Sequence, residues 1–109
     1  GLIGQETGID IEGVPQVGRM LYYQHGLGTG CDNPYWCGAH FDHGFFTALT
    51  PGVYFVGNTT IQEPEEAGLF VKVQGVFQKV PSDPSVMLFQ AAEFGQLMMD
   101  DAILATEHR

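Results

Sequence analysis

The sequence is short of basic side chains and of long apolar runs. Of its 109 residues, 4 are Lys or Arg and 13 are Asp or Glu, which gives a formal net charge of −9 at pH 7. So few cations provide no electrostatic footprint for nucleic acid or for an anionic membrane surface. No apolar run approaches the roughly 18 residues that a membrane helix needs. We therefore expect no nucleic acid and no membrane as partner, but a small molecule or a metal ion.

Cysteine is scarce as well. The 2 cysteines, Cys31 and Cys37, lie in a stretch rich in Gly and Asn. A secreted mini-protein uses such a pair as a staple, which a chain of this length does not need. Their spacing also differs from the short spacings of zinc knuckles. Two reduced thiols in a loop are the favoured interpretation, with a disulfide as the alternative, and we expect a cytoplasmic protein.

The residues that are present predict one small domain built from strands. A hydrophobic content of 44% excludes wholesale disorder, and 15 Gly and 6 Pro interrupt the chain every few residues. Many short strands separated by such turns are typical of an all-β sandwich or barrel-like domain. We divide the chain into an N-terminal connecting segment, residues 1–18, and a core, residues 19–109.

The clearest local signal is a hairpin, in which residues 69–73 and 76–80 flank the turn dipeptide Gln74-Gly75. Residues 90–99 contain good helix formers, but Gly95 and the β-rich surroundings favour strands there. Further strands are predicted over residues 19–24, 53–56, 86–89 and 102–106, the last of them leading to His108.

Two expectations concern side-chain burial. Residues 58–68, with three glutamates around Pro64, are interpreted as a solvated loop. Four phenylalanines are expected to fill the core, with one or two of them lining a substrate pocket as the alternative, namely Phe45, Phe46, Phe70 and Phe89.

His40 and Asp42 are the first candidates for chemistry. They are two residues apart, so on an extended backbone both side chains leave the same face. With a third ligand from a distant strand, such a pair forms the arrangement of two histidines and one carboxylate that is typical of non-haem Fe(II) oxygenases. The pair alone is a weak signal, because an exposed turn acid near a histidine has the same spacing.

The surrounding motifs are more specific. Residues 38–49, Gly-Ala-His-Phe-Asp-His-Gly-Phe-Phe-Thr-Ala-Leu, resemble the metal-binding segment of the 2-oxoglutarate- and Fe(II)-dependent oxygenases, in the branch that includes isopenicillin N synthase. Gly68-Leu69, Gly75 and Val80-Pro81 resemble the hairpin that follows in that branch. Residues 93–98 and 105–109 resemble the stretch leading to the distal metal histidine, so the resemblance extends over about residues 19–109.

This resemblance implies a double-stranded β-helix, the jelly-roll or cupin-like fold, with His40, Asp42 and His108 as ligands of Fe(II). It implies 2-oxoglutarate as cosubstrate and O2 as oxidant, with release of succinate and CO2 and oxidation of a C–H bond in a small-molecule substrate. Tyr23 resembles the tyrosine that contacts the cosubstrate in the family, although Leu21 stands where the family has Asn.

The largest departure from the family concerns the cosubstrate arginine. The family carries Arg-x-Ser about ten residues beyond the distal histidine, whereas this sequence ends with Arg109 directly after His108. We therefore expect a fragment whose jelly-roll is incomplete at its last strand. The alternatives are a metal-binding cupin-like module, a catalytically incompetent fragment, or a zinc hydrolase with the same three ligands.

Overall fold

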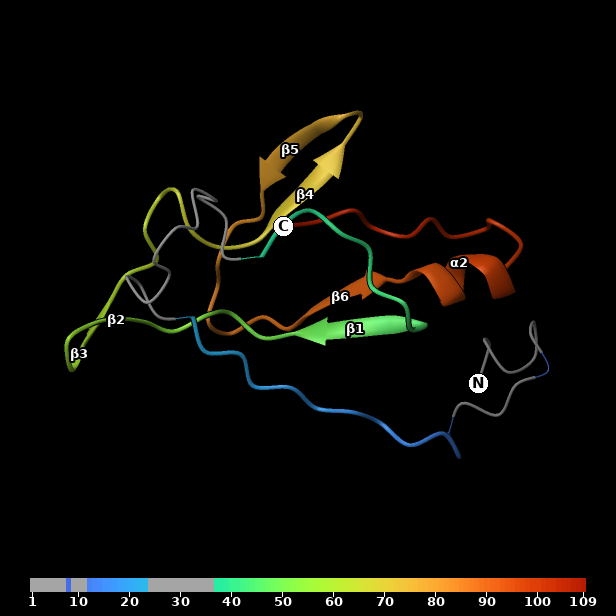
Figure 1. The fold of residues 1–109 in the computed structure, drawn as a ribbon, viewed down its shortest axis with the longest axis horizontal. Helices are drawn as coiled ribbons and strands as arrows, with labels where there is room; N and C mark the ends of the chain where they lie inside the picture. Colours follow the sequence, from blue (N-terminus) through green and yellow to red (C-terminus); the bar gives the residue numbers. More distant parts are fainter. Residues whose placement is uncertain (1–7, 9–11, 24–36) are drawn as a thin grey trace. The chain divides into compact units, whose positions relative to one another are not determined.

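The computed structural model describes residue 8, residues 12–23 and residues 37–109. Strands predominate over helix in these residues, and they form three antiparallel sheets of two strands each: β1 with β6, β2 with β3, and β4 with β5 (Figure 1). The elements are β1 (Phe46–Leu49), β2 (Tyr54–Val56), β3 (Thr59–Ile61), β4 (Phe70–Val73), β5 (Val76–Lys79), β6 (Leu88–Ala91) and one helix, α2 (Glu93–Met98). This content of many strands and little helix is consistent with the predicted all-β class.

In the described part of the chain, no helix is long and apolar enough to span a bilayer.

The chain divides into two compact units, Gly1–Gly38 and Ala39–Arg109. The strand predicted over residues 19–24 is wrong for its described part, because residues 19–23 have no regular structure. Met20 and Tyr22 are 98% and 80% exposed there. A β-favouring sequence forms a strand against a half-buried pleated surface, and within the described residues these exposed side chains have no such surface. Gln24, the last residue of the predicted strand, and Cys31, one of the two predicted thiols, lie outside the described residues.

The predicted hairpin is confirmed as β4 and β5. Val73 pairs with Val76, so the loop consists of Gln74 and Gly75 alone. Both residues have positive φ, 50° and 83°, as a type I′ turn requires. Gly75 adopts this conformation without steric cost, and the turn fixes the register of β4 against β5.

A second hairpin forms where only one strand was predicted. The run over residues 53–56 is confirmed as β2, but the loop prediction for residues 58–68 is wrong at its start, because β3 pairs with β2. It is also wrong for Glu63, whose side chain is only 14% exposed and whose Oε1 lies 3.0 Å from Lys79 Nζ. The partner on β5, distant in sequence, keeps this one acid out of solvent.

The prediction of strands over residues 90–99 is wrong after Ala91, because Glu93–Met98 is helical. Gly95 was taken as a sign of a strand, but it serves close packing. Its N–H donates to the Gly44 carbonyl at 3.2 Å. A Cβ at this position would overlap the carbonyl oxygen of Phe45 and lie 3.2 Å from the carbonyl carbon. Helix α2 therefore rests directly on the backbone of residues 44–45.

The β1–β6 ribbon exposes the side chains that were expected in the core. Thr47 pairs with Gln90, and their side chains share the more buried face, since the faces of a strand alternate. The opposite face carries Phe46 and Phe89, which are 43% and 71% exposed, so the core prediction is wrong for these two. Among the residues described, Ala92 is the one buried apolar side chain. Hydrogen bonds between the paired strands, rather than a large apolar core, therefore hold β1 and β6 together.

The last predicted strand is reduced to a short pairing at its end. Residues 102–106 form no strand, and the pairing is confined to isolated bridges of His108 with His40 and with Val71. The Ala105 N–H donates to the side-chain oxygen of Gln96 at 2.6 Å instead of to a neighbouring strand. The double-stranded β-helix itself stays a prediction.

Candidate metal centre

A backbone bridge brings together two histidines that are far apart in sequence. His40 N–H donates to the His108 carbonyl at 2.9 Å, and His108 N–H donates to the His40 carbonyl at 3.0 Å. Residues that exchange both hydrogen bonds in an antiparallel pair stand directly opposite, with side chains on the same face. The two imidazole rings accordingly lie 4.3 Å apart between centroids.

The opposite edge of the His108 segment is held by β4. Phe70 and Arg109 exchange backbone hydrogen bonds of 2.9 and 3.0 Å, and Lys72 N–H donates to the Glu107 carbonyl at 2.9 Å. The Arg109 guanidinium also lies 4.5 Å from the centroid of the Phe77 ring. The segment around His108 is thus hydrogen-bonded on both sides, and the side chain of His108 is only 8% exposed. The C-terminal residues lie at the base of the β4–β5 hairpin (Figure 1).

Asp42 completes the group from the same segment as His40. Its Oδ1 lies 3.4 Å from His40 Nε2 and 3.8 Å from His108 Nε2. The Asp42 carbonyl accepts a hydrogen bond of 2.8 Å from the Glu93 N–H at the start of α2. The helix that rests on residues 44–45 therefore also fixes the backbone of this carboxylate.

The three side chains fit a divalent metal ion. One donor atom from each of His40, Asp42 and His108 lies within 4.8 Å of the other two, and no other such group occurs in the described part of the chain. Bonds of about 2.1 Å from nitrogen and oxygen would place neighbouring donors about 3.0 Å apart at right angles. The observed separations of 3.4 and 3.8 Å from Asp42 Oδ1 to the two histidines are wider than this, so the side chains would have to rotate toward an ion to bind it. Two imidazoles and one carboxylate are donors that Fe(II), Zn(II) and related ions accept.

The second oxygen of Asp42 is held away from this group. Thr47 Oγ1 donates to Oδ2 at 2.5 Å, and Gln90 Nε2 donates to the same atom at 2.8 Å. Burial by itself raises the pKa of Asp42, but the hydrogen bonds from Thr47 and Gln90 and the nearby histidines outweigh burial and lower the pKa. The carboxylate is therefore ionised at neutral pH, with Oδ1 directed at both histidines.

A backbone carbonyl fixes the tautomer of His108. Its Nδ1 lies 2.9 Å from the Thr106 carbonyl oxygen, which can only accept, so neutral His108 carries its proton on Nδ1. Nε2 is left with a lone pair that faces Asp42. This is the usual way in which a protein orients a metal-binding imidazole.

The structure thus brings together the three residues predicted as metal ligands. Tyr23, the predicted cosubstrate contact, belongs to the unit Gly1–Gly38, where its side chain is 42% exposed and burial and the Cys37 thiol raise its pKa. His43 stays outside the group, because its exposed ring lies 2.6 Å from the Glu93 carboxylate.

Sequence reasoning missed the two residues that hold Asp42. Thr47 was noted as part of a motif but given no role, and Gln90 was not singled out. Only the register of β1 against β6 reveals that they are cross-strand partners on the face toward Asp42. A polar residue between apolar neighbours on a buried strand face was the available signal.

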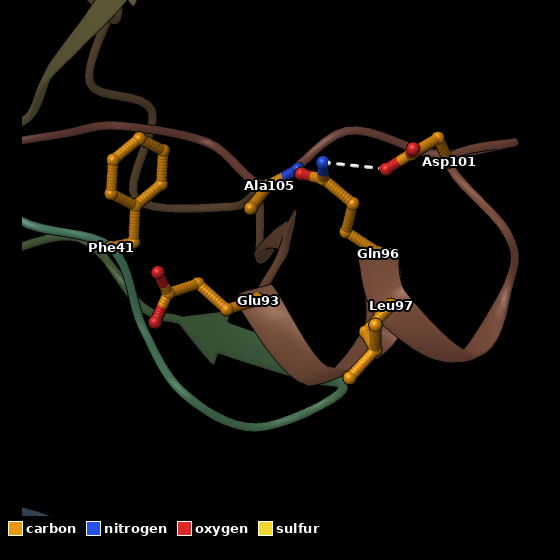
Figure 2. Close-up of a pocket in the computed structure, with 6 residues that line it drawn as sticks. All are labelled: Phe41, Glu93, Gln96, Leu97, Asp101 and Ala105. Atoms are coloured by element: carbon orange, nitrogen blue, oxygen red, sulfur yellow. Dashed lines mark hydrogen bonds between the residues drawn. The ribbon is translucent and has the colours of Figure 1, made fainter.

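A shallow pocket lies beside α2, with a volume of about 340 Å³. Figure 2 shows its six lining residues, namely Phe41, Glu93, Gln96, Leu97, Asp101 and Ala105. The Gln96 amide spans one side, where its nitrogen donates to Asp101 at 2.8 Å. None of the three metal ligands lines this pocket, although Phe41 stands between His40 and Asp42 in sequence.

Comparisons of the chain with models of protein families, with curated proteins and with solved structures return no match. The chemistry of the His-Asp-His group and the motifs around it are therefore what point to a function.

Proposed function

We propose that the chain carries the metal centre of an Fe(II)- and 2-oxoglutarate-dependent oxygenase of the isopenicillin N synthase-like branch. In this proposal His40, Asp42 and His108 would hold Fe(II). With 2-oxoglutarate and O2 as further reactants, a small organic molecule would be oxidised at a C–H bond. The bound iron would supply the redox chemistry that converts 2-oxoglutarate to succinate and CO2.

One observation carries the proposal. His40, Asp42 and His108 were chosen from two motifs whose histidines are 68 positions apart, and one donor atom of each lies within 4.8 Å of the other two. Convergence of two imidazoles and one carboxylate is not required by any of the local motifs, since the hairpin and the helix form without it. The hydrogen bonds of Asp42 Oδ2 support a carboxylate that offers one oxygen only. A ligand set of this kind leaves positions open for other molecules, as oxygenase chemistry needs.

The residues around the ligands have separate tasks in this proposal. Thr47 and Gln90 orient Asp42, and the Thr106 carbonyl keeps the proton of His108 on Nδ1. The bridge between His40 and His108 keeps both rings on one face. His40 and Asp42, with side chains 41% and 25% exposed, leave the centre open to molecules from solvent.

We also propose that the ribbons belong to a double-stranded β-helix. In that fold, facing sheets carry the metal ligands at one end of the barrel. The pairing of residue 108 with residue 40 on one side and with β4 on the other gives a sheet of this kind more than two segments wide. The β1–β6 ribbon, whose Thr47 and Gln90 reach Asp42, is then part of the sheet that faces it.

A second candidate is a cupin-like module that binds a metal ion without turning over 2-oxoglutarate. It is favoured by the cations of the unit Ala39–Arg109, each of which is already engaged. Lys72 pairs with Glu107, Lys79 pairs with Glu63, and the Arg109 guanidinium lies over two phenylalanine rings. The distal carboxylate of 2-oxoglutarate would need a cation, typically an arginine that forms two parallel hydrogen bonds.

The test is an anaerobic titration of the full-length protein with Fe(II) and then with 2-oxoglutarate, followed by admission of O2 and assay of succinate. Binding of both, with a metal-to-ligand charge-transfer band and succinate formation, is expected for the oxygenase. His40→Ala and Asp42→Ala should abolish the band and the succinate, while His43→Ala should retain both.

The outcomes separate the candidates. Fe(II) binding without a charge-transfer band or succinate would favour the metal-binding module. Turnover that persists in His40→Ala or Asp42→Ala would contradict the ligand assignment. Zn(II)-dependent hydrolysis in place of Fe(II)-dependent succinate formation would favour a hydrolase.

A further inference from the structure

Gln90 is a buried polar residue next to the proposed ligands. It is a central residue of β6 and is 7% exposed. Its Nε2 lies 2.8 Å from Asp42 Oδ2 and 3.1 Å from His108 Nε2. A polar side chain buried on a strand face thus contacts two of the three proposed ligands at once.

The direction of these hydrogen bonds follows from the partners. A carboxylate oxygen only accepts, so the amide nitrogen rather than the oxygen of Gln90 faces Asp42. His108 carries its proton on Nδ1, so its Nε2 also accepts. Both N–H bonds of the Gln90 amide are therefore used, one toward Asp42 and one toward the lone pair of His108.

The other end of the amide is not compensated. Gln90 Oε1 is buried and has no hydrogen-bond partner among the described residues. Native proteins satisfy most such atoms, because an unpartnered buried carbonyl lowers stability. The position of this side chain satisfies the amide nitrogen, whereas the amide oxygen is left as an unpaired buried acceptor that lowers stability.

We infer that Gln90 is a positioning residue of the metal centre, which competes with the metal ion for the lone pair of His108 Nε2. This inference depends on the proposed function for the identity of the ligands. An ion that binds His108 must displace one Gln90 N–H, which then loses its acceptor. The second N–H stays on Asp42 Oδ2, where Thr47 already provides a hydrogen bond of 2.5 Å. The competition is thus peculiar to Gln90, whereas the support of Asp42 is shared.

Two substitutions separate the competition from the support of Asp42. Thr47→Val removes one hydrogen bond to Asp42 Oδ2 without relieving any competition, and should weaken Zn(II) binding by roughly two- to tenfold, the range of one net hydrogen bond. Gln90→Met keeps the length of the side chain and also loses one hydrogen bond to Asp42 Oδ2, but it frees the lone pair of His108, so it should bind Zn(II) more tightly than Thr47→Val by roughly the same factor. Gln78→Met, the same change at an exposed position of β5, is the matched control and should leave affinity unchanged.

The experiment is calorimetric titration of the full chain and its variants with Zn(II), together with NMR of the glutamine side-chain amides. In the wild-type chain, the signals of the Gln90 amide should shift as Zn(II) saturates the centre, because one N–H changes partner. This measurement does not depend on any variant folding.

The results distinguish this inference from the proposed function. If Zn(II) binds the wild-type chain and is lost in His40→Ala, the metal centre stands. Binding by Gln90→Met that is equal to or weaker than that of Thr47→Val, or amide signals that do not move, would then overturn the role of Gln90 alone. Absence of Zn(II) binding to the wild-type chain would overturn both.

Discussion

Replacement of Gly95 by alanine tests whether α2 holds the metal-binding segment in place. Alanine favours a helix over glycine by about 1 kcal/mol, so helix propensity alone predicts that Gly95→Ala stabilises the chain. The packing predicts the opposite, because the added Cβ would overlap the Phe45 carbonyl oxygen and lie 3.3 Å from Phe45 Cα. The obstacle is backbone and cannot rotate away, so the helix or residues 44–45 must move.

The magnitude follows from these two effects. Overfilling a packed contact costs about 1 to 3 kcal/mol, which exceeds the gain in propensity over most of that range. We expect Gly95→Ala to lower the free energy of unfolding by about 1 kcal/mol. Metal affinity should fall as well, because the first turn of the same helix holds the Asp42 carbonyl through Glu93 N–H at 2.8 Å.

The assay is denaturant unfolding followed by circular dichroism, with metal titration of the folded variant. Gly44→Ala is the matched control, since a Cβ at Gly44 meets no atom within 4 Å and should leave stability and affinity nearly unchanged. A Gly95→Ala chain that is more stable than the wild type, or that loses no metal affinity, would refute the reasoning.

Three further predictions concern the hairpins. Burial and the nearby Glu63 carboxylate raise the pKa of Tyr54 above 10.0. The stability that its protonated phenol contributes is therefore complete below pH 10 and is lost as the pH rises through the pKa of the folded state. Tyrosinate absorbance should show Tyr54 ionising at lower pH in Glu63→Gln, and an unchanged titration would contradict this. Lys79→Met removes the ion pair of 3.0 Å with Glu63 and two hydrogen bonds to backbone carbonyls, and should lower the free energy of unfolding by about 1 to 3 kcal/mol, a loss that equal denaturation midpoints would disprove. Arg109→Met removes the cation 4.5 Å from the Phe77 ring and should cost about 0.5 to 1 kcal/mol in thermal unfolding, whereas a higher melting temperature would count against it.

Local features of the fold were predictable because their causes are local. The β4–β5 hairpin follows from a turn dipeptide between two β-favouring runs, and the structure has it with the expected loop. The alternation of side chains along an extended segment likewise placed His40 and Asp42 on one face. Each of these inferences needs only neighbouring residues.

Features that depend on distant partners were missed. Gly95 was misread because its neighbour is a backbone carbonyl 50 residues earlier, at Phe45, which no local pattern announces. Phe89 was expected in the core, but the register with β1 turns Gln90 inward and leaves Phe89 71% exposed. A shift by one residue exchanges the two faces of a strand, and composition cannot resolve it.

The metal ligands were predictable only in part from local sequence. His40 and Asp42 are visible in one short motif, whereas His108 was named through its resemblance to a family motif. Their proximity arises from the bridge between residues 40 and 108, a contact between distant segments. Thr47 and Gln90 could be assigned only once that arrangement was known.

Stoichiometric metal binding tests the central claim most directly. In an anaerobic calorimetric titration with Fe(II), the wild-type chain should bind one ion, and Asp42→Ala and His108→Ala should each lose that binding. His43→Ala, which alters an exposed histidine next to the metal segment, should bind as the wild type does. Equal Fe(II) affinity in the wild type, Asp42→Ala and His108→Ala would contradict the account.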